Sequence, residues 1–178
     1  CCDGALSKLL EAKLHQLVAV VGDGDSLSDT LREQFAPLFV YDGNQETNDL
    51  TKSVQYALSQ GWSKLTIVGA TGQREDHTLG NISLLAEYAS YCDIEMLTDY
   101  GRFRVVSGSA AIESFPKQQV SIFSITPQVP VTVRGLEYPI ENRCLERWWE
   151  GTLNAAIGNT FEIMGGKIIV YQTYDPKI

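Results

Sequence analysis

Cysteine is scarce in this sequence, and its positions form no pattern. The four cysteines (Cys1, Cys2, Cys92 and Cys144) show no C-x-x-C spacing and no regular framework, which is atypical of a disulfide-stapled secreted domain. We therefore expect reduced thiols and a cytoplasmic protein. A chain of 178 residues can bury roughly two-thirds of the surface that it exposes when unfolded, so it needs no disulfide to be stable.

Long apolar runs and an excess of positive charge are also missing. No stretch approaches the roughly 18 apolar residues of a membrane span, and no signal peptide is visible. The net charge of −8 opposes docking on the phosphate backbone of a nucleic acid. We therefore expect no membrane partner and no nucleic-acid partner. The first residues, CCDGALSKLL, look like the end of a strand, so we expect that a leading segment is missing.

Short apolar runs alternate with helical patterns in the first half of the chain. Valine-rich runs predict strands, and polar caps followed by apolar residues at helical spacing predict helices between them. This alternation is typical of βαβ units and a parallel sheet. In the last of these helices, Leu79, Ile82, Leu85 and Ala89 are expected to face inward. The expected strands lie at 17–23, 37–42 and 64–72, and the expected helices at 26–35, opened by a capping box between Ser26 and Asp29, at 47–61 and at 76–89.

The second half has a different texture. From about residue 94, short β-branched runs are broken by Gly, Pro and Asp, and a hairpin is predicted around Gly165 and Gly166. One polar-aromatic segment, NRCLERWWEG, interrupts the strands. We therefore expect an α/β domain over residues 1–93 and a small antiparallel β-sandwich, or alternatively a barrel, over residues 94–178.

Two acids follow the first expected strand. In an open parallel sheet, ligands bind beyond the carboxyl ends of the strands. Asp23 and Asp25 stand at such an end, and residues two apart in an extended segment point the same way, so both carboxylates can face one metal ion. Mg²⁺ usually takes one or two carboxylates and completes its shell with water and phosphate oxygens. An Asp-Gly turn beside a helix cap is the simpler reading, and the pair alone favours it.

A third acid and a lysine open the second expected helix. Asp49 and Lys52 are three residues apart in QETNDLTK, away from the apolar side formed by Leu50 and Val54, so both can point at the sheet edge. A carboxylate and an amine that neutralises phosphate suit a metal–nucleotide site. Alternatively, Asp49 only compensates the dipole of the helix.

The third stretch is GATGQREDH, a glycine loop that runs into a helix. Gly69 and Gly72 let the backbone approach a ligand, the helix start offers N–H groups to an anion, and Arg74 can grip phosphate oxygens. Neither a Walker loop nor a G-x-G-x-x-G motif is present. The alternative is a surface ion pair among Arg74, Asp76 and His77.

Taken in order, the motifs resemble those of the thiamin pyrophosphokinase family. CDGAL, GDGDS, QETNDLTK and GATGQREDHTLGN resemble the family's Asp-Gly-Gly/Ala, Gly-Asp-Phe-Asp-Ser, Gln-x-x-Thr/Asn-Asp-x-x-Lys and Gly-Ala-x-Gly-Gly-Arg-x-Asp-His. RGLEYPI and GTLN resemble two further family segments in the second half. The resemblance spans nearly the whole chain. It implies a Rossmann-like α/β nucleotide domain followed by a β-sandwich, in a homodimer that holds thiamin between its subunits.

The resemblance also implies a reaction and roles for the motif residues. A pyrophosphoryl group would pass from ATP to the hydroxyl of thiamin, giving thiamin diphosphate and AMP. Asp76 would orient or deprotonate that hydroxyl. Asp23, Asp25 and Asp49 would hold Mg²⁺, and Gln45, Lys52 and Arg74 would contact phosphates. Further ligand contacts are implied at Asp3, Ser26, Asn48, Gly69, Thr71, Gly72 and His77.

An aromatic wall for thiamin is expected near the GTLN segment. Thiamin carries a permanent positive charge, which an aromatic face attracts. Trp148 and Trp149 are the candidates, with Thr152 and Asn154 as polar partners, and Trp149 is preferred because it is nearer the glycine turn. Packing in the core or in a dimer contact is the alternative for both indoles. The chain departs from the family pattern at Gly24, which replaces an aromatic residue, and at Leu153, which replaces a serine.

Three other functions remain open at this point. A pyrophosphokinase for another heterocyclic alcohol, such as a hydroxymethylpterin, would keep the same acids and differ within residues 130–160. A non-catalytic nucleotide or thiamin sensor would not need the whole acidic set, and a structural interaction module would bind no ATP. A homodimer is expected to form mainly through the second half, where apolar strands such as KIIVY need cover.

Overall fold

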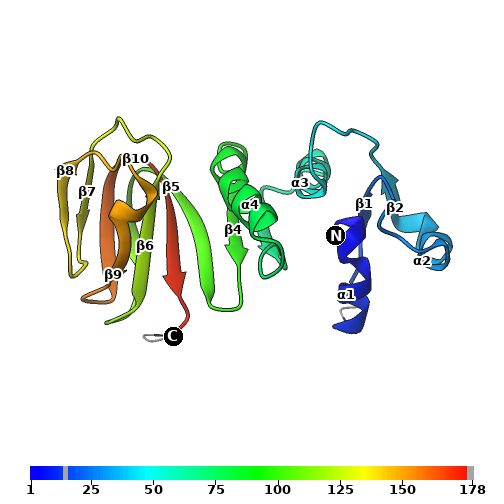
Figure 1. Ribbon diagram of the computed structural model, residues 1–178, viewed down its shortest axis with the longest axis horizontal. Coiled ribbons are helices and arrows are strands. Elements are labelled where there is room, and N and C mark those ends of the chain that lie inside the picture. The colour runs from blue at the N-terminus through cyan, green and yellow to red at the C-terminus, as the bar shows by residue number, and fades with distance from the viewer. Residues whose placement is uncertain (14–15, 176–178) are drawn as a thin grey trace. The chain divides into compact units, whose positions relative to one another are not determined.

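The computed structural model describes residues 1–13 and 16–175. By packing, the chain divides into two compact units, residues 1–63 and 64–178 (Figure 1), and each is described by itself. The second unit begins at residue 64 because the strand that starts there pairs with the next strand of that unit. The functional boundary between residues 93 and 94 stays a prediction. No helix among the described residues is long and apolar enough to cross a membrane.

A short parallel sheet lies at the centre of the first unit. β1 (Val20–Gly22) pairs in parallel with β2 (Phe39–Tyr41), and Cys2 forms an isolated parallel bridge with Val21. The parallel pairing predicted from the alternating pattern is thus confirmed for these strands. The helical segments of the unit are η1 (Asp3–Ala5), α1 (Leu6–Glu11), α2 (Asp29–Gln34), η2 (Ala36–Leu38) and α3 (Asp49–Ser59).

The first of the expected helix caps is wrong by two residues. Ser28, rather than Ser26, is the N-cap of α2, and its Oγ accepts a hydrogen bond from the backbone N–H of Leu31 at 3.3 Å. The preceding residues form a turn in which the N–H of Leu27 donates to the carbonyl of Gly24. Ser26 therefore belongs to the loop after β1, next to the two acids, and not to the helix.

The second unit is built on an eight-stranded sheet. Its strand order is β3-β4-β5-β10-β6-β9, with β7 paired to β10 and β8 paired to β7. β3 and β4 are parallel, and the other pairs are antiparallel. Helix α4 (Glu75–Tyr88) packs against β4, β5 and β10. The strands are β3 (Lys64–Val68), β4 (Asp93–Leu97), β5 (Gly101–Glu113), β6 (Gln119–Ser124), β7 (Val131–Arg134), β8 (Ile140–Arg143), β9 (Gly151–Ala155) and β10 (Thr160–Thr173), and η3 (Trp148–Glu150) precedes β9.

The hairpin predicted around Gly165 and Gly166 is wrong. Both glycines lie inside β10, at a bulge between Met164 and Lys167 where the register against β5 shifts. Before the bulge β10 pairs with β7, and after it β10 pairs with β6. A Cβ at Gly165 would overlap the carbonyl oxygen of Pro130, so the strand can change partners here only without a side chain.

The bulge gives the two halves of β10 a common core. Side chains from both halves, including Phe161 and Ile163 before the bulge and Ile168 and Val170 after it, belong to one buried cluster with residues of β6, β7 and β8. The strand segment KIIVY is therefore already flanked by β5 and β6. It does not need the cover from a second subunit that the sequence suggested.

The inward face predicted for α4 is only partly correct. Leu85, Ala86 and Tyr88 are buried, whereas Leu79 is 56% exposed. Periodicity gives the apolar side of a helix but not the stretch of that side which a neighbour covers. The start of α4, which follows the glycine loop, is thus left open.

Candidate active site

The carboxyl ends of β1 and β2 lie at one edge of the parallel sheet. The N–H of Asp42, just after β2, donates to the carbonyl of Gly22 at the end of β1. Asp23 follows directly. Its Oδ1 accepts from the N–H of Asp25 at 3.1 Å, and its Oδ2 accepts from Nε2 of Gln45 at 3.2 Å. The bond from Asp25 and, to a smaller extent, the bond from Gln45 lower the pKa of Asp23. The carboxylate is therefore charged at neutral pH.

Helix α3 supplies the second part of this site. Its N-cap is Asn48, whose side chain accepts from the N–H of Thr51 at 2.9 Å, so the helix begins with Asp49 at its first position. Lys52 lies one turn later, and its Nζ is 3.2 Å from Oδ1 of Asp49. Burial lowers the pKa of Lys52, but Asp49, Asp23 and Asp42 outweigh it, and the pKa is raised. The structure thus brings the lysine together with three acids, and the amine remains charged.

Asp42 was not among the residues that the sequence singled out. It stands at the end of β2, half-buried, and it contributes to the raised pKa of Lys52. Its Oδ1 accepts from the N–H of Asn44 at 3.0 Å. The signal was present in PLFVYD, because the same rule that selected Asp23 at the end of one parallel strand applies to the next strand.

The acids suit a hard metal ion in chemical type but do not form a ready-made cage. Within residues 1–13 and 16–175, no group of three or more His, Cys, Asp or Glu side chains is placed to hold a metal ion. Asp25 is exposed, and Asp23 and Asp49 keep oxygen lone pairs beyond the hydrogen bonds described above. Mg²⁺ usually needs only one or two carboxylates and takes its remaining ligands from water and phosphate, so the residues present fit that ion.

Asp3 is placed differently from the other acids. Only 1% of the residue is exposed, and its two carboxylate oxygens accept from the backbone N–H groups of Gly4 and Gly24, at 2.6 and 2.8 Å. Ser26 lies close by, with its Oγ 3.5 Å from the position of a Cβ on Gly4. Asp3 thus contacts the backbone of the loop that carries the acids, and its oxygens point away from solvent.

In the second unit, the predicted glycine loop follows β3. Gly69 and Gly72 have left-handed φ values of 69° and 85°, and a Cβ on either would meet nothing within 4 Å. A hydrogen bond ties the loop to α4, because Nδ2 of Asn81 donates to the carbonyl of Ala70 at 2.9 Å. Thr71 lies between the two glycines, half-buried. The backbone of the loop is therefore open to a ligand.

Arg74 and Asp76 form a two-point ion pair at the start of α4. Nε and NH2 of Arg74 donate to Oδ1 and Oδ2 of Asp76 at 3.1 and 2.6 Å, and both side chains are largely exposed. The bond from Arg74 lowers the pKa of Asp76. The backbone N–H of His77 also donates to Asp76. The three residues are thus brought together as the sequence suggested, with Arg74 occupied by its neighbour.

Neither Trp148 nor Trp149 is a core residue. Trp148 is 45% exposed and Trp149 65% exposed. The ring of Trp148 lies edge-on to Phe123 of β6, with centroids 5.7 Å apart. The backbone carbonyl of Trp149 accepts from Oγ1 of Thr152 at 2.8 Å, but its ring stacks on no aromatic ring of the described chain. Trp149 is therefore the more available of the two indoles.

Asn154 and Leu153 have contrasting environments. Asn154 is buried; its Oδ1 accepts from the N–H groups of Tyr138 and Ala155, and its Nδ2 donates to the carbonyl of Tyr138 at 2.7 Å. The amide therefore clamps the RGLEYPI segment to β9. Leu153 has a left-handed φ of 57° and is 85% exposed. A leucine in this conformation is uncommon.

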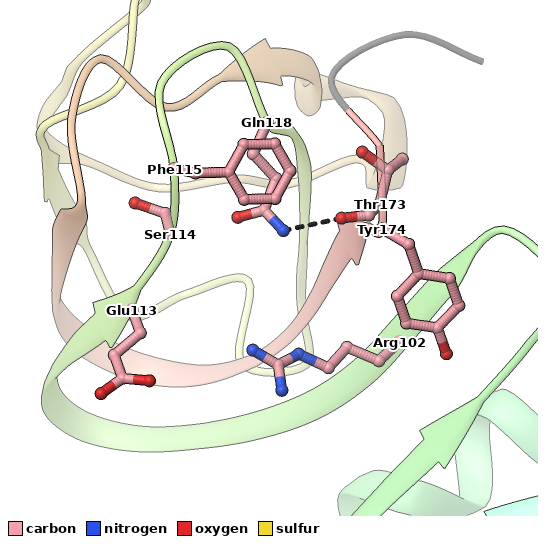
Figure 2. A pocket seen from close by; sticks show the side chains of 7 residues that line it. All are labelled: Arg102, Glu113, Ser114, Phe115, Gln118, Thr173 and Tyr174. Carbon is pink, nitrogen blue, oxygen red and sulfur yellow. Dashed lines mark hydrogen bonds between the residues drawn. The ribbon is translucent and has the colours of Figure 1, made fainter.

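The second unit also contains a pocket that no predicted residue lines. Figure 2 shows it beside the ends of β5 and β10. Its volume is about 310 Å³. The buried amide of Gln118 forms part of the wall and donates to the carbonyl of Thr173 at 2.7 Å. The lining residues are Arg102, Glu113, Ser114, Phe115, Gln118, Thr173 and Tyr174.

Sequence comparisons agree with the motifs. The family model described as thiamin pyrophosphokinase, catalytic domain, matches residues 1–96, and the model described as thiamin pyrophosphokinase, substrate-binding domain, matches residues 101–171. Among curated proteins, the thiamine pyrophosphokinase of Bacillus subtilis (strain 168) is 29% identical over 141 residues, which cover 70% of this chain. The chain spans 62% of the length of that relative.

Solved structures of similar fold carry the same family name. Thiamine pyrophosphokinase from Bacillus subtilis superimposes with a TM-score of 0.82 at 24% identity, over 98% of this chain and 86% of that one. Thiamin pyrophosphokinase from Geobacillus thermodenitrificans superimposes with a TM-score of 0.80 at 26% identity, over 99% of this chain and 86% of that one. The arrangement of parallel strands followed by a large antiparallel sheet is thus shared with these proteins.

Proposed function

Because the chain belongs to the thiamin pyrophosphokinase family, we propose that it transfers the pyrophosphoryl group of ATP to the hydroxyl of thiamin, giving thiamin diphosphate and AMP. The observation that carries this proposal is that the catalytic-domain and substrate-binding-domain models match in succession, over residues 1–96 and 101–171. The proposed domains are a Rossmann-like ATP-binding domain over 1–93 and a sandwich over 94–178 that binds thiamin and forms the dimer.

The residues of the first unit are assigned to the triphosphate. Transfer of this kind depends on alignment and neutralisation of charge more than on covalent chemistry. Lys52 is suited to neutralise phosphate oxygens because its amine is charged and its side chain is fixed by burial. Gln45, which donates to Asp23, would hold that carboxylate and reach a phosphate beside it.

Asp23, Asp25 and Asp49 would hold Mg²⁺ in this proposal. The ion, when bound, would offset the negative charge of the triphosphate and so allow an alcohol to approach it. The lowered pKa of Asp23 supports the assignment, since a metal ligand must be ionised at the working pH.

The glycine loop and the start of α4 are assigned to phosphate and acceptor. The open backbone at Gly69 and Gly72 supports a close approach of phosphate oxygens, and Arg74 would add a charged donor through the N–H groups that do not bond to Asp76. Asp76 has a lowered pKa, which makes it a weak base. We therefore assign it to orient the hydroxyl of thiamin by accepting a hydrogen bond, rather than to remove the proton before transfer.

The acceptor is assigned to the region of Trp149. An indole that is 65% exposed and unstacked offers its face to the thiazolium ring. The same region exposes Tyr138, Leu153 and Ile157. A second copy of the chain would cover these apolar side chains. The proposed enzyme is thus a homodimer, and its free cysteines suit the cytoplasm.

One assay tests the proposal. The protein is incubated with ATP, Mg²⁺ and thiamin, and AMP and thiamin diphosphate are quantified by chromatography; equal amounts of both are expected. Reactions without thiamin, and with the Asp49→Asn variant, serve as controls. AMP with a hydroxymethylpterin but not with thiamin would reassign the acceptor. ATP binding without any transfer would favour a sensor, and no ATP binding at all would exclude a kinase.

A further inference from the structure

The residue between the two proposed metal ligands is held by both of its peptide groups. The N–H of Gly24 donates to Oδ2 of the buried Asp3 at 2.8 Å. Its carbonyl accepts from NH2 of Arg32 in α2 at 2.6 Å. Asp23 and Asp25 flank this glycine, so the loop that presents their carboxylates is fixed by an anion from η1 and by a cation from α2.

The space around the loop leaves little room for a side chain at Gly22 or Gly24. A Cβ on Gly22 would overlap the carboxyl group of Asp3, and a Cβ on Gly24 would come within 3.1 Å of the ring of Phe39. Gly24 has a φ of 83°, which a larger residue adopts only with strain. The departure from the aromatic residue of the family pattern at this position is therefore matched by Phe39 and Arg32, which occupy the room that a side chain would need.

Hydrogen bonds that backbone N–H groups donate to a buried carboxylate are stronger than those to a neutral acceptor, and one of the two is lost if one oxygen is replaced by the NH2 group of an amide. Asp3 uses one oxygen for Gly4 and the other for Gly24. Because only 1% of Asp3 is exposed and both of its oxygens accept from backbone N–H groups, Asp3 is not suited to touch a nucleotide directly. Its chemistry is suited to fixing the backbone.

We propose that Asp3 and Arg32 are positioning residues, which hold Gly24 so that Asp23 and Asp25 present their carboxylates to a divalent cation. This inference rests on the proposed function for the role of the cation in turnover, but not for the binding of the cation itself. Groups that orient metal ligands typically change metal affinity or activity about 10- to 100-fold when removed. We expect a change of that size for both residues.

The test compares Asp3→Asn and Arg32→Met with two matched controls, Asp29→Asn and Lys8→Met, which remove one exposed charge of the same sign from the same unit. Binding of Mn²⁺ is measured by electron paramagnetic resonance, with and without ATP. Both positioning variants should bind Mn²⁺ at least about tenfold more weakly, while ATP affinity in EDTA and the KM for thiamin stay unchanged. Arg32→Lys, which keeps a cation, should recover part of the loss.

A measurement on the unaltered protein covers the case in which Asp3→Asn does not fold. The amide proton of Gly24 should be shifted downfield and exchange slowly with solvent, unlike that of the exposed Ser26. Wild-type Mn²⁺ affinity in both Arg32→Met and Asp3→Asn, or rapid exchange at Gly24, overturns the inference. Weakened Mn²⁺ binding in the variants of a protein that does not turn over thiamin would instead keep the inference and refute the proposed function.

Discussion

Nζ of Lys52 lies 3.2 Å from Oδ1 of Asp49, and the lysine side chain is 3% exposed whereas the aspartate side chain is 42% exposed. The pair is therefore asymmetric: the cation is fixed inside the unit, and the anion faces solvent at the sheet edge. An exposed ion pair contributes little to stability. Because the three acids outweigh the burial of the amine and raise its pKa, Lys52 stays charged, and groups with perturbed pKa values cluster at functional sites.

Replacing the lysine should therefore affect activity more than folding. Lys52→Met keeps a long flexible side chain in the same space, so we expect the free energy of unfolding to change by less than about 1.5 kcal/mol. Loss of the charge should lower kcat by roughly 10²- to 10³-fold. Urea unfolding and the AMP assay measure the two effects, with Lys8→Met as control. A variant with normal kcat would remove Lys52 from the site.

The metal assignment predicts a loss of turnover without a loss of fold. Asp23→Asn and Asp49→Asn change neither size nor shape, and neither side chain is buried, so Asp23→Asn should shift unfolding by less than about 1 kcal/mol. Asp49→Asn should shift it more, because it removes the partner of the buried Lys52, without abolishing the fold. Turnover should fall below detection, as it should for the unaltered protein in EDTA. The exposed Glu33→Gln variant is the control. Full activity of either aspartate variant would contradict the assignment.

The ion pair of Arg74 and Asp76 predicts a change in pH dependence. Because Arg74 lowers the pKa of Asp76, any stability from the pair is present above the ordinary pKa of a carboxyl group and is lost as the pH falls through the lowered value. Arg74→Met should raise the pKa of Asp76 towards its ordinary value. Carbon-13 NMR of the carboxyl group follows both titrations. An unchanged midpoint would mean that the pair does not persist in solution.

The local sequence predicted the positions of the first three strands well, and the site residues at their ends stay predictions. β1, β2 and β3 lie within short runs that contain β-branched or aromatic residues, which favour strands. Asp23, Asp49 and Lys52 could be selected because a strand end or a helix start fixes their direction. The burial of Asp3 could not be predicted from the sequence. It depends on contact with the loop after β1, about twenty residues further along the chain.

Long-range pairing accounts for the errors in the second unit. Two adjacent glycines between β-branched runs look the same in a hairpin and in a bulge. Only the change of partner, from β7 to β6, decides that Gly165 and Gly166 lie within one strand. The hydrogen bonds of Asn154 also reach a segment sixteen residues away, so they could not be read from the local sequence; the ligand contact suggested for Asn154 stays a prediction.

Removing the Asn154 clamp should cost stability. Asn154→Ala deletes three hydrogen bonds and leaves backbone groups of Tyr138 and Ala155 without a partner, so we expect destabilisation of about 2–3 kcal/mol. Asn159→Ala, at an exposed site nearby, should change stability by less than about 0.5 kcal/mol. Urea denaturation compares them. Equal stability of the two variants would show that the clamp is not formed in solution.

The two adjacent indoles should separate into one that stabilises the fold and one that binds the acceptor. Trp148 packs edge-on against Phe123, and such aromatic pairs contribute about 0.5–1.5 kcal/mol, so Trp148→Ala should lower stability by at least that amount.

Trp149 is more exposed and unstacked. Trp149→Ala should weaken thiamin binding by roughly 0.5–2 kcal/mol through loss of the cation–π contact, and it should leave ATP binding unchanged because the triphosphate is assigned to other residues. Calorimetric titration with each substrate distinguishes the two. An uncharged thiamin analogue is the control, because its affinity should change less in Trp149→Ala than that of thiamin. If thiamin affinity is unaffected in both variants, the acceptor binds elsewhere and the assignment to this segment is wrong.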